Sequence, residues 1–223
     1  MLFRSAILAD EINRTPPKTQ AALLQAMQEH EITAAGETYK LEEPFFVLAT
    51  QNPIEQEGTY PLPEAQLDRF MFNIFVDYPS VTEEENIVKA TTVAPNYKLD
   101  KILTGKEIIE FQQLVRRVPV SDFLIEYAVS LARATRPNND NSPDFIKNWV
   151  SWGAGPRASQ YMILAAKTKA ILDGRPTPGP EDVKFAALPV LRHRIVTSFN
   201  AEADGVDTAV IVEKLLETVK AKS

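Results

Sequence analysis

The hydrophobic positions of the first hundred residues form short unbroken runs with helix-like spacing between them. Parallel strands are covered on both faces and therefore read as continuous apolar runs, so three such runs predict buried strands. The predicted strands are residues 3–9, 45–50 and 72–76. Their alternation with helical segments predicts an α/β sheet for this part of the chain.

Helix and turn signals lie between these runs. Thr15, followed by two prolines, predicts the N-cap and first turn of a helix that continues to about Glu29. Ala35 and Gly36, between two short alternating stretches, predict a hairpin over residues 31–41. A further short helix is predicted over residues 64–70.

Beyond Pro79 the pattern is helical. Thr82 with Glu85 predicts a capping box that opens a helix to about Thr92, and Pro, Gly and Asn clusters separate the later helices. These are predicted at 104–116, 121–135, 143–151, 157–172, 180–193 and 206–220. The sequence therefore predicts an α/β part, residues 1–96, followed by an all-α part, residues 97–223.

Composition narrows the class of protein. Of 223 residues, 44% are hydrophobic and 24% charged, as in globular domains, and no stretch approaches the roughly 20 apolar residues of a membrane span. The N-terminus is too short and polar for a secretory signal. The chain has no cysteine, which excludes disulfides and thiolate metal sites and favours a cytoplasmic location. A net charge of −6 disfavours a broad nucleic-acid surface.

Three polar residues follow predicted strands. Asp10 and Glu11 end the first one, at the edge where open α/β sheets bind ligands. In a phosphate-hydrolysing site Asp10 would hold Mg²⁺, mainly through water, and Glu11 would orient and deprotonate the attacking water. Asn52, past the second strand, would lie beside Glu11 and position that water or touch the γ-phosphate. The alternatives are solvated acids at a strand end and a simple Asn-Pro turn.

Arginines provide the second set of candidates. Arg69, just before the third predicted strand, could reach the γ-phosphate of a neighbouring subunit. Its alternative is a local ion pair with Asp68 or Glu64. Arg157 opens a predicted helix after Pro156 and could project toward bound phosphate, or face solvent instead.

Longer motifs relate these residues to a family. The runs ILADEINR (7–14), ATQNP (49–53) and LPEAQLDRF (62–70) closely resemble the MoxR branch of the AAA+ ATPases. Three later runs resemble the lid of that family: ATRP (134–137), GAGPRA (153–158) and VLRHRI (190–195). The resemblance covers nearly the whole chain.

The resemblance implies specific roles and partners. Asp10 and Glu11 would be the Walker B acids, Asn52 sensor 1, Arg69 the arginine finger and Arg157 sensor 2, acting on ATP and Mg²⁺. The fold would be a partial P-loop core, with strands 3 to 5 of a sheet ordered 5-1-4-3-2, and a helical AAA lid. The family implies a ring, usually a hexamer, that remodels client proteins in a chaperone-like way. Such clients or partners often carry a von Willebrand factor A domain.

Two differences from the family's sequence pattern limit how far its properties can be expected of this chain. None of the eight glycines begins the Walker A pattern Gly-x-x-x-x-Gly-Lys-[Ser/Thr], whose loop normally grips the phosphates and would lie upstream of Met1. This chain alone is therefore expected to bind nucleotide poorly or not at all, and residues 1–79 to be incomplete as a domain. The family also usually has Ser where this chain has Gly155, at the cost of a side-chain cap.

Two other classes of function remain open. One is a non-enzymatic interaction module that kept the lid and lost turnover. The other is a DNA-remodelling ring, which the acidic balance disfavours. Arg192 and Arg194, on either side of His193, are expected at a solvated helix end, with contact to a neighbouring subunit as the alternative.

Overall fold

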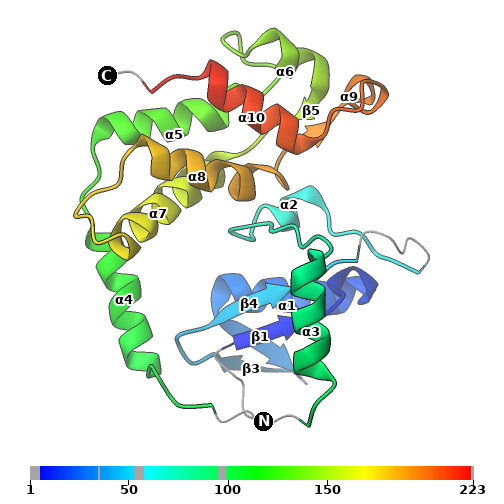
Figure 1. Cartoon of the computed structure of the whole chain (residues 1–223), viewed down its shortest axis with the longest axis vertical. Helices are drawn as coiled ribbons and strands as arrows, with labels where there is room; N and C mark the ends of the chain where they lie inside the picture. The colour runs from blue at the N-terminus through cyan, green and yellow to red at the C-terminus, as the bar shows by residue number, and fades with distance from the viewer. Residues whose placement is uncertain (1–5, 35, 53–57, 95–98, 222–223) are drawn as a thin grey trace.

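A computed structural model describes residues 6–34, 36–52, 58–94 and 99–221. The described chain has two parts, seen one above the other in Figure 1. A small α/β part contains β1 (Ala6–Ala9), β4 (Phe46–Ala49) and α1 (Pro17–Glu29), and a larger helical part extends from α4 (Gly105–Arg117) to α10 (Thr208–Thr218). Helix α4 runs along one side of the molecule and packs against α7 (Pro156–Leu172).

The sheet of the α/β part contains two parallel strands, β1 (Ala6–Ala9) and β4 (Phe46–Ala49). Their register places Ala6 opposite Phe46 and Ala9 opposite Ala49. The first two predicted strands are thus confirmed over these residues, while residues 3–5 lie outside the described part. The prediction of burial on both faces is wrong, because Leu8 and Leu48 are 65% and 58% exposed.

The third predicted strand, residues 72–76, does not form. The segment has no strand assignment, and the side chains of Ile74, Phe75 and Val76 are largely exposed. Among the described residues the parallel sheet contains β1 and β4 alone, and neither pairs with this segment. A strand without a hydrogen-bonding neighbour has no ladder to join. Its Asn73 N–H instead donates to the carbonyl of Pro189 in the helical part, at 2.8 Å.

Helix α1 (Pro17–Glu29) and the antiparallel hairpin of β2 (Glu31–Ala34) and β3 (Glu37–Lys40) are confirmed. The N-cap is Pro16 and not Thr15. The Thr15 hydroxyl donates instead to the Ile12 carbonyl at 2.7 Å, which closes the short 3₁₀ turn Ile12–Arg14.

A small core joins these elements. Its buried residues are Ile12, Leu24 and Leu62, and Ala9, Ala49 and Phe70 pack around them.

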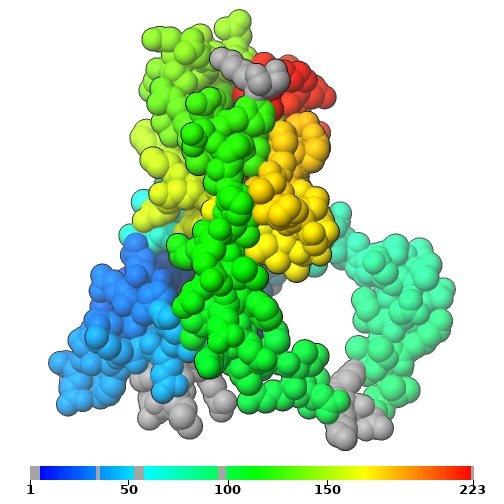
Figure 2. Space-filling model, turned by 90° about the vertical axis from the view of Figure 1, so that its left-hand side faces the viewer, coloured from blue at the N-terminus to red at the C-terminus, as the bar shows by residue number. Residues whose placement is uncertain are grey.

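Helix α2 (Glu64–Leu67) is shorter than predicted, and α3 (Val81–Thr91) begins at a different cap. The capping box is formed by Ser80 and Glu83 and not by Thr82 and Glu85, since both pairs fit the motif and the helix starts at the earlier one. Every residue of α3 is exposed. Figure 2 shows α3 standing apart from α4 and the helices above.

The helical part contains the predicted helices in the predicted order. They are α4, α5 (Asp122–Ala134), α6 (Asp144–Trp149), α7 (Pro156–Leu172), α8 (Pro180–Leu191) and α10 (Thr208–Thr218). Three short elements were not predicted: β5 (Val150–Trp152), which pairs with β6 (Val196–Thr197), and α9 (Phe199–Ala203). None of the described helices is long and apolar enough to cross a membrane.

The helical part has the main core of the molecule. Leu131, Met162, Leu191, Ile211 and Leu215 are fully buried there, drawn from α5, α7, α8 and α10. The segment after α8 faces the α/β part, so this core supports the elements that reach the candidate site.

Candidate functional site

The two acids at the end of β1 share one partner, Thr50. Its hydroxyl donates to Asp10 Oδ1 at 2.6 Å and accepts from the backbone N–H of Glu11 at 2.8 Å. Thr50 directly follows β4, and its backbone pairs with Ala9 and Ile12 at 3.0 Å each. The parallel pairing of β1 and β4 therefore fixes both the position of the acids and the carboxylate of Asp10.

Glu11 has a strained backbone. Its φ of 46° and ψ of 54° lie in the left-handed region, which costs a non-glycine residue about 1–3 kcal/mol. This turn directs the chain from the end of β1 into the 3₁₀ turn, and its carboxylate meets Arg14 Nη1 at 3.0 Å. Strain of this kind is concentrated at active sites, which supports a functional role for Glu11.

Asn52 lies beside these acids, as the sequence predicted. Asn13, in the turn after Glu11, donates from Nδ2 to the Asn52 carbonyl at 3.4 Å. Asp10, Glu11 and Asn52 all line one open hollow of about 880 Å³, which we call the Asp10 hollow.

The Asp10 hollow is acidic. Its described lining contains four carboxylates and a single basic side chain, Arg192; the carboxylates belong to Asp10, Glu11, Asp77 and Asp207. The Arg192 guanidinium lies 4.6 Å from the ring centroid of Phe75, within cation–π range. Arg192 is the C-cap of α8, as a helix-end position predicts, but it is half-buried and lines the hollow instead of being fully solvated.

Arg157 is not among the described residues that line the hollow. Its Nη1 donates to Asp68 Oδ2 at 2.9 Å, and its side chain is 42% exposed. It does open a helix, as predicted, with Pro156 in the first turn of α7. The structure thus places it at the junction between the two parts of the molecule.

Arg69 lies in the same junction, in the turn after α2. Its carbonyl accepts from the Tyr161 hydroxyl at 3.3 Å, and its Nε is buried without a hydrogen-bond partner in the described part of the chain. A local pair with Asp68 or Glu64 was the alternative for Arg69. The Asp68 carboxylate is bound to Arg157 and Arg194 instead, and no Arg69–Glu64 ion pair is found among the described residues.

Arg194 is buried at this junction, so the prediction of a solvated helix end is wrong for it, and the neighbouring His193 is partly buried there. The Arg194 side chain is 1% exposed and donates to Asp68 Oδ1 at 2.8 Å. His193 Nε2 lies 3.0 Å from the Phe70 carbonyl oxygen. Burial, with the nearby Arg194 charge as a second cause, lowers the pKa of His193 to about 4, so the ring is neutral at pH 7.

Sequence reasoning missed the roles of Thr50, Asp68 and Arg194. Thr50 and Asp68 stand inside motifs already quoted, one or two residues from a candidate, so their position was a usable signal. Arg194 also stands inside a quoted motif, but its burial depends on a contact 126 residues away in sequence, which the motif alone does not indicate.

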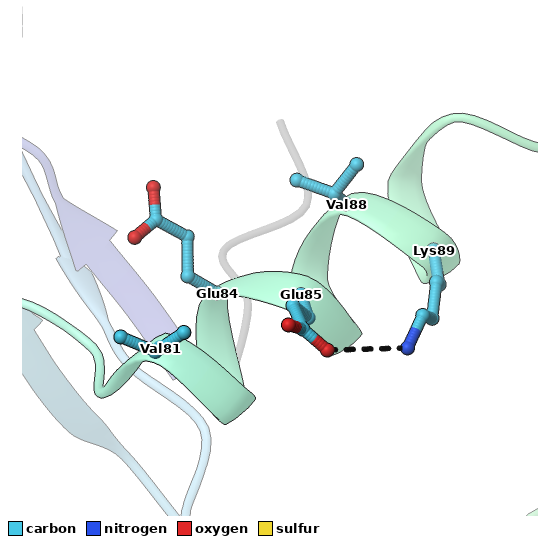
Figure 3. A pocket seen from close by; sticks show the side chains of 5 residues that line it. All are labelled: Val81, Glu84, Glu85, Val88 and Lys89. Carbon is cyan, nitrogen blue, oxygen red and sulfur yellow. Dashed lines mark ion pairs between the residues drawn. The ribbon is translucent and has the colours of Figure 1, made fainter.

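A second hollow lies on α3 and is lined by five residues of that helix alone, shown in Figure 3. Glu85 and Lys89 form an ion pair there at 3.5 Å. Exposed pairs of this type contribute little, and these side chains converge on no common point. We assign no chemistry to this surface.

Comparisons with known proteins agree with the geometry. Residues 1–72 match the family described as ATPase family associated with various cellular activities (AAA), and residues 146–215 match the AAA lid domain.

Two curated proteins are similar over nearly the whole chain. Chaperone MoxR1 of Mycobacterium tuberculosis is 43% identical over 96% of this chain and 56% of its own length. The uncharacterized protein YeaC of Bacillus subtilis is 40% identical over 98% of this chain and 66% of its own length. The chain thus spans between about half and two thirds of these relatives.

A solved structure matches the fold. The crystal structure of a candidate ATPase from Cytophaga hutchinsonii aligns with a TM-score of 0.91 at 40% identity, over 98% of this chain and 67% of that chain. The parallel β1–β4 pair and the helical lid are therefore parts of an AAA+ ATPase fold. The chain belongs to the MoxR family of AAA+ ATPases.

Proposed function

We propose that the chain forms the Walker B-to-lid portion, with the core part at 1–96 and the lid part at 97–223, of a MoxR-type ATPase that remodels partner proteins. The observation that supports this most directly is the convergence of Asp10, Glu11 and Asn52 on one hollow. These residues come from two strand ends that are separated by about forty positions. Acids and an amide in this arrangement suit water activation beside a phosphate.

Asp10 is suited to Mg²⁺. Among the described residues no group of three or more His, Cys, Asp or Glu side chains could hold a metal ion, so a closed protein cage is excluded there. Mg²⁺ commonly uses only one or two carboxylates and takes its remaining ligands from water and phosphate. The Asp10 carboxylate, held by Thr50 and open to the hollow, fits that mode. Bound Mg²⁺ would neutralise charge on the phosphate oxygens.

Glu11 would act as the base and Asn52 as the residue that orients the water. The Arg14 guanidinium contacts the Glu11 carboxylate at 3.0 Å in a partly exposed ion pair. Asn52 would donate from its amide to the attacking water or to the γ-phosphate. Arg69 would serve the neighbouring subunit, and Arg157 the nucleotide of its own chain.

The described residues around the Asp10 hollow offer few groups that would grip a triphosphate. The sequence contains no Walker A pattern, and the charged side chains of the described lining are four carboxylates and one arginine. Repulsion between these carboxylates and phosphate would weaken binding further.

We propose that the full protein is a ring, usually a hexamer, in the cytoplasm, and that its partners include proteins with a von Willebrand factor A domain.

Calorimetric titration of this chain with ATP and Mg²⁺ tests whether these residues alone can bind the triphosphate. We expect no measurable binding, or binding far weaker than micromolar. A dissociation constant in the micromolar range or below would contradict it. The codons upstream of Met1 provide an independent check, since an in-frame Walker A motif is expected there.

A second candidate function is a non-enzymatic interaction module that kept the lid. The well-packed helical part favours it. Native translation that starts at Met1 would support this module, whereas an upstream in-frame Walker A motif would exclude it.

A further inference from the structure

The carboxylate of Asp68 lies between two arginines of the lid. Asp68 follows α2 directly, and its Oδ1 accepts from Arg194 Nε at 2.8 Å. Its other oxygen, Oδ2, accepts from Arg157 Nη1 at 2.9 Å. One side chain of the α/β part therefore joins the start of α7 and the turn after α8.

The two arginines differ in how firmly they are held. Arg194 is 1% exposed, and it also donates through Nη2 to the carbonyls of Asp68 and Phe70, at 2.8 and 2.6 Å. Arg157 is 42% exposed. Buried, charge-assisted hydrogen bonds are costly to break, whereas a partly exposed ion pair exchanges readily. Arg194 thus fixes Asp68, and Asp68 presents its second oxygen to Arg157.

The chain segment that begins with Asp68 is bonded to the lid along its length. The Arg69 carbonyl accepts from Tyr161 of α7 at 3.3 Å, and the Phe70 carbonyl accepts from Arg194. The Asn73 N–H donates to the Pro189 carbonyl of α8 at 2.8 Å. The backbone from which Arg69 projects is therefore set by the lid as well as by the small core below it.

We propose that Asp68 is a positioning residue for both arginines of the proposed site. It holds the guanidinium of Arg157 directly, and through Arg194 it anchors the backbone that carries Arg69. This inference rests on the proposed function, in which Arg69 and Arg157 contact phosphate. Asp68 itself acts on the reaction only through these arginines.

Asp68→Asn separates the two halves of this arrangement. The amide oxygen of Asn can still accept a hydrogen bond from the buried Arg194. The amide NH₂ then faces Arg157, and because both groups are donors they cannot form a hydrogen bond. The substitution should therefore release Arg157 and keep the Arg194 contact. Asp182→Asn is the matched control, because it weakens the Arg175–Asp182 pair elsewhere in the lid.

Nitrogen-15 NMR of the arginine side chains in this chain measures the release. We expect D68N to raise the solvent exchange of the Arg157 guanidinium protons roughly two- to fivefold, the change that loss of a partly exposed ion pair implies. D182N should leave these signals unchanged. Equal Arg157 exchange in the wild type and D68N would overturn the proposal. If D68N does not fold, Asp68→Ser, which also removes the carboxylate, is measured in its place, and an Arg157 signal unmoved by it would have the same meaning.

Steady-state kinetics of ATP hydrolysis by the full-length protein provide the functional readout. D68N should lower kcat about tenfold or more and change KM for ATP less than about threefold, with D68E recovering part of the loss. Wild-type turnover with an unchanged D68N kcat would overturn the positioning role. A wild-type protein without turnover would instead contradict the proposed function, and the NMR result would then decide whether Asp68 holds Arg157.

Discussion

At the residue scale, the hydroxyl of Thr50 controls the geometry of both acids. It donates to Asp10 and accepts from the Glu11 N–H, so it orders a carboxylate and a strained backbone together. The sequence predicted that Asp10, Glu11 and Asn52 would meet, because parallel strands end at one edge of a sheet. It could not predict the Thr50 contacts, which depend on side-chain geometry across β1 and β4.

Replacing Thr50 with valine removes the hydroxyl and nearly keeps the shape of the side chain. We expect Thr50→Val to lower the free energy of unfolding by about 1 kcal/mol, since two hydrogen bonds are lost at a strained turn. Urea denaturation measures this. Thr91→Val is the control, because the Thr91 hydroxyl donates only within its own exposed helix, to Ile87. Equal effects of the two substitutions would contradict the role given to Thr50.

His193 should make stability depend on pH. Its pKa is about 4 in the folded chain and near 6.5 when unfolded, so the unfolded state binds more protons between these values. The stabilisation is therefore complete above pH 6.5 and is lost as the pH falls toward 4. Relative to His193→Gln, the wild type should lose about 2 kcal/mol between pH 7 and pH 5. The unfolding free energies of both proteins are measured across this pH range. The same pH dependence in both would contradict a lowered pKa for His193.

At the element scale, helices were predicted far better than the third strand. Amphipathic spacing and caps are local signals, which is why α4 to α8 and α10 follow their predicted ranges closely. Residues 72–76 have the composition of a strand, but a strand also needs a neighbour for its backbone. The hydrophobic pattern of residues 72–76 does not indicate whether a neighbouring strand is present. The short β5–β6 pair was missed for the opposite reason, because two or three residues leave almost no periodicity.

Two glycines before α7 should respond oppositely to substitution. A Cβ at Gly153 would lie 2.4 Å from the Thr135 carbonyl oxygen, whereas a Cβ at Gly155 would meet nothing within 4 Å. Gly153→Ala should therefore destabilise the chain by about 1–3 kcal/mol. Gly155→Ser adds a side-chain cap to α7 and should stabilise it by roughly a few tenths of a kcal/mol. Thermal unfolding compares the two, and a tolerated Gly153→Ala would refute the close packing inferred there.

At the scale of the whole molecule, stability is distributed unevenly. Twenty buried hydrophobic residues form the core of the helical part, whereas three form the core of the α/β part, counted over the described chain. The exposed side chains of Leu8, Leu48 and Phe75 add apolar surface that the α/β part does not cover. The division at residues 96 and 97 stays a prediction, and proteolysis can locate it.

Limited proteolysis should release a protected fragment that runs from α4 through α10. Its well-packed core keeps it closed, while the α/β part should be digested because few buried contacts oppose local opening. Mass spectrometry identifies the fragments. A protected fragment confined to the first 79 residues would show that the α/β part is stable by itself, contrary to this expectation.

The central claim is that the residues lining the Asp10 hollow are the part of an ATPase active site that activates water for ATP hydrolysis. The most direct test is ATP turnover by the gene-length protein with Glu11→Gln, which keeps the shape of the side chain and removes the base. We predict that kcat falls by about 10²–10⁴ while ATP binding persists. Turnover at the wild-type rate in Glu11→Gln would contradict the claim.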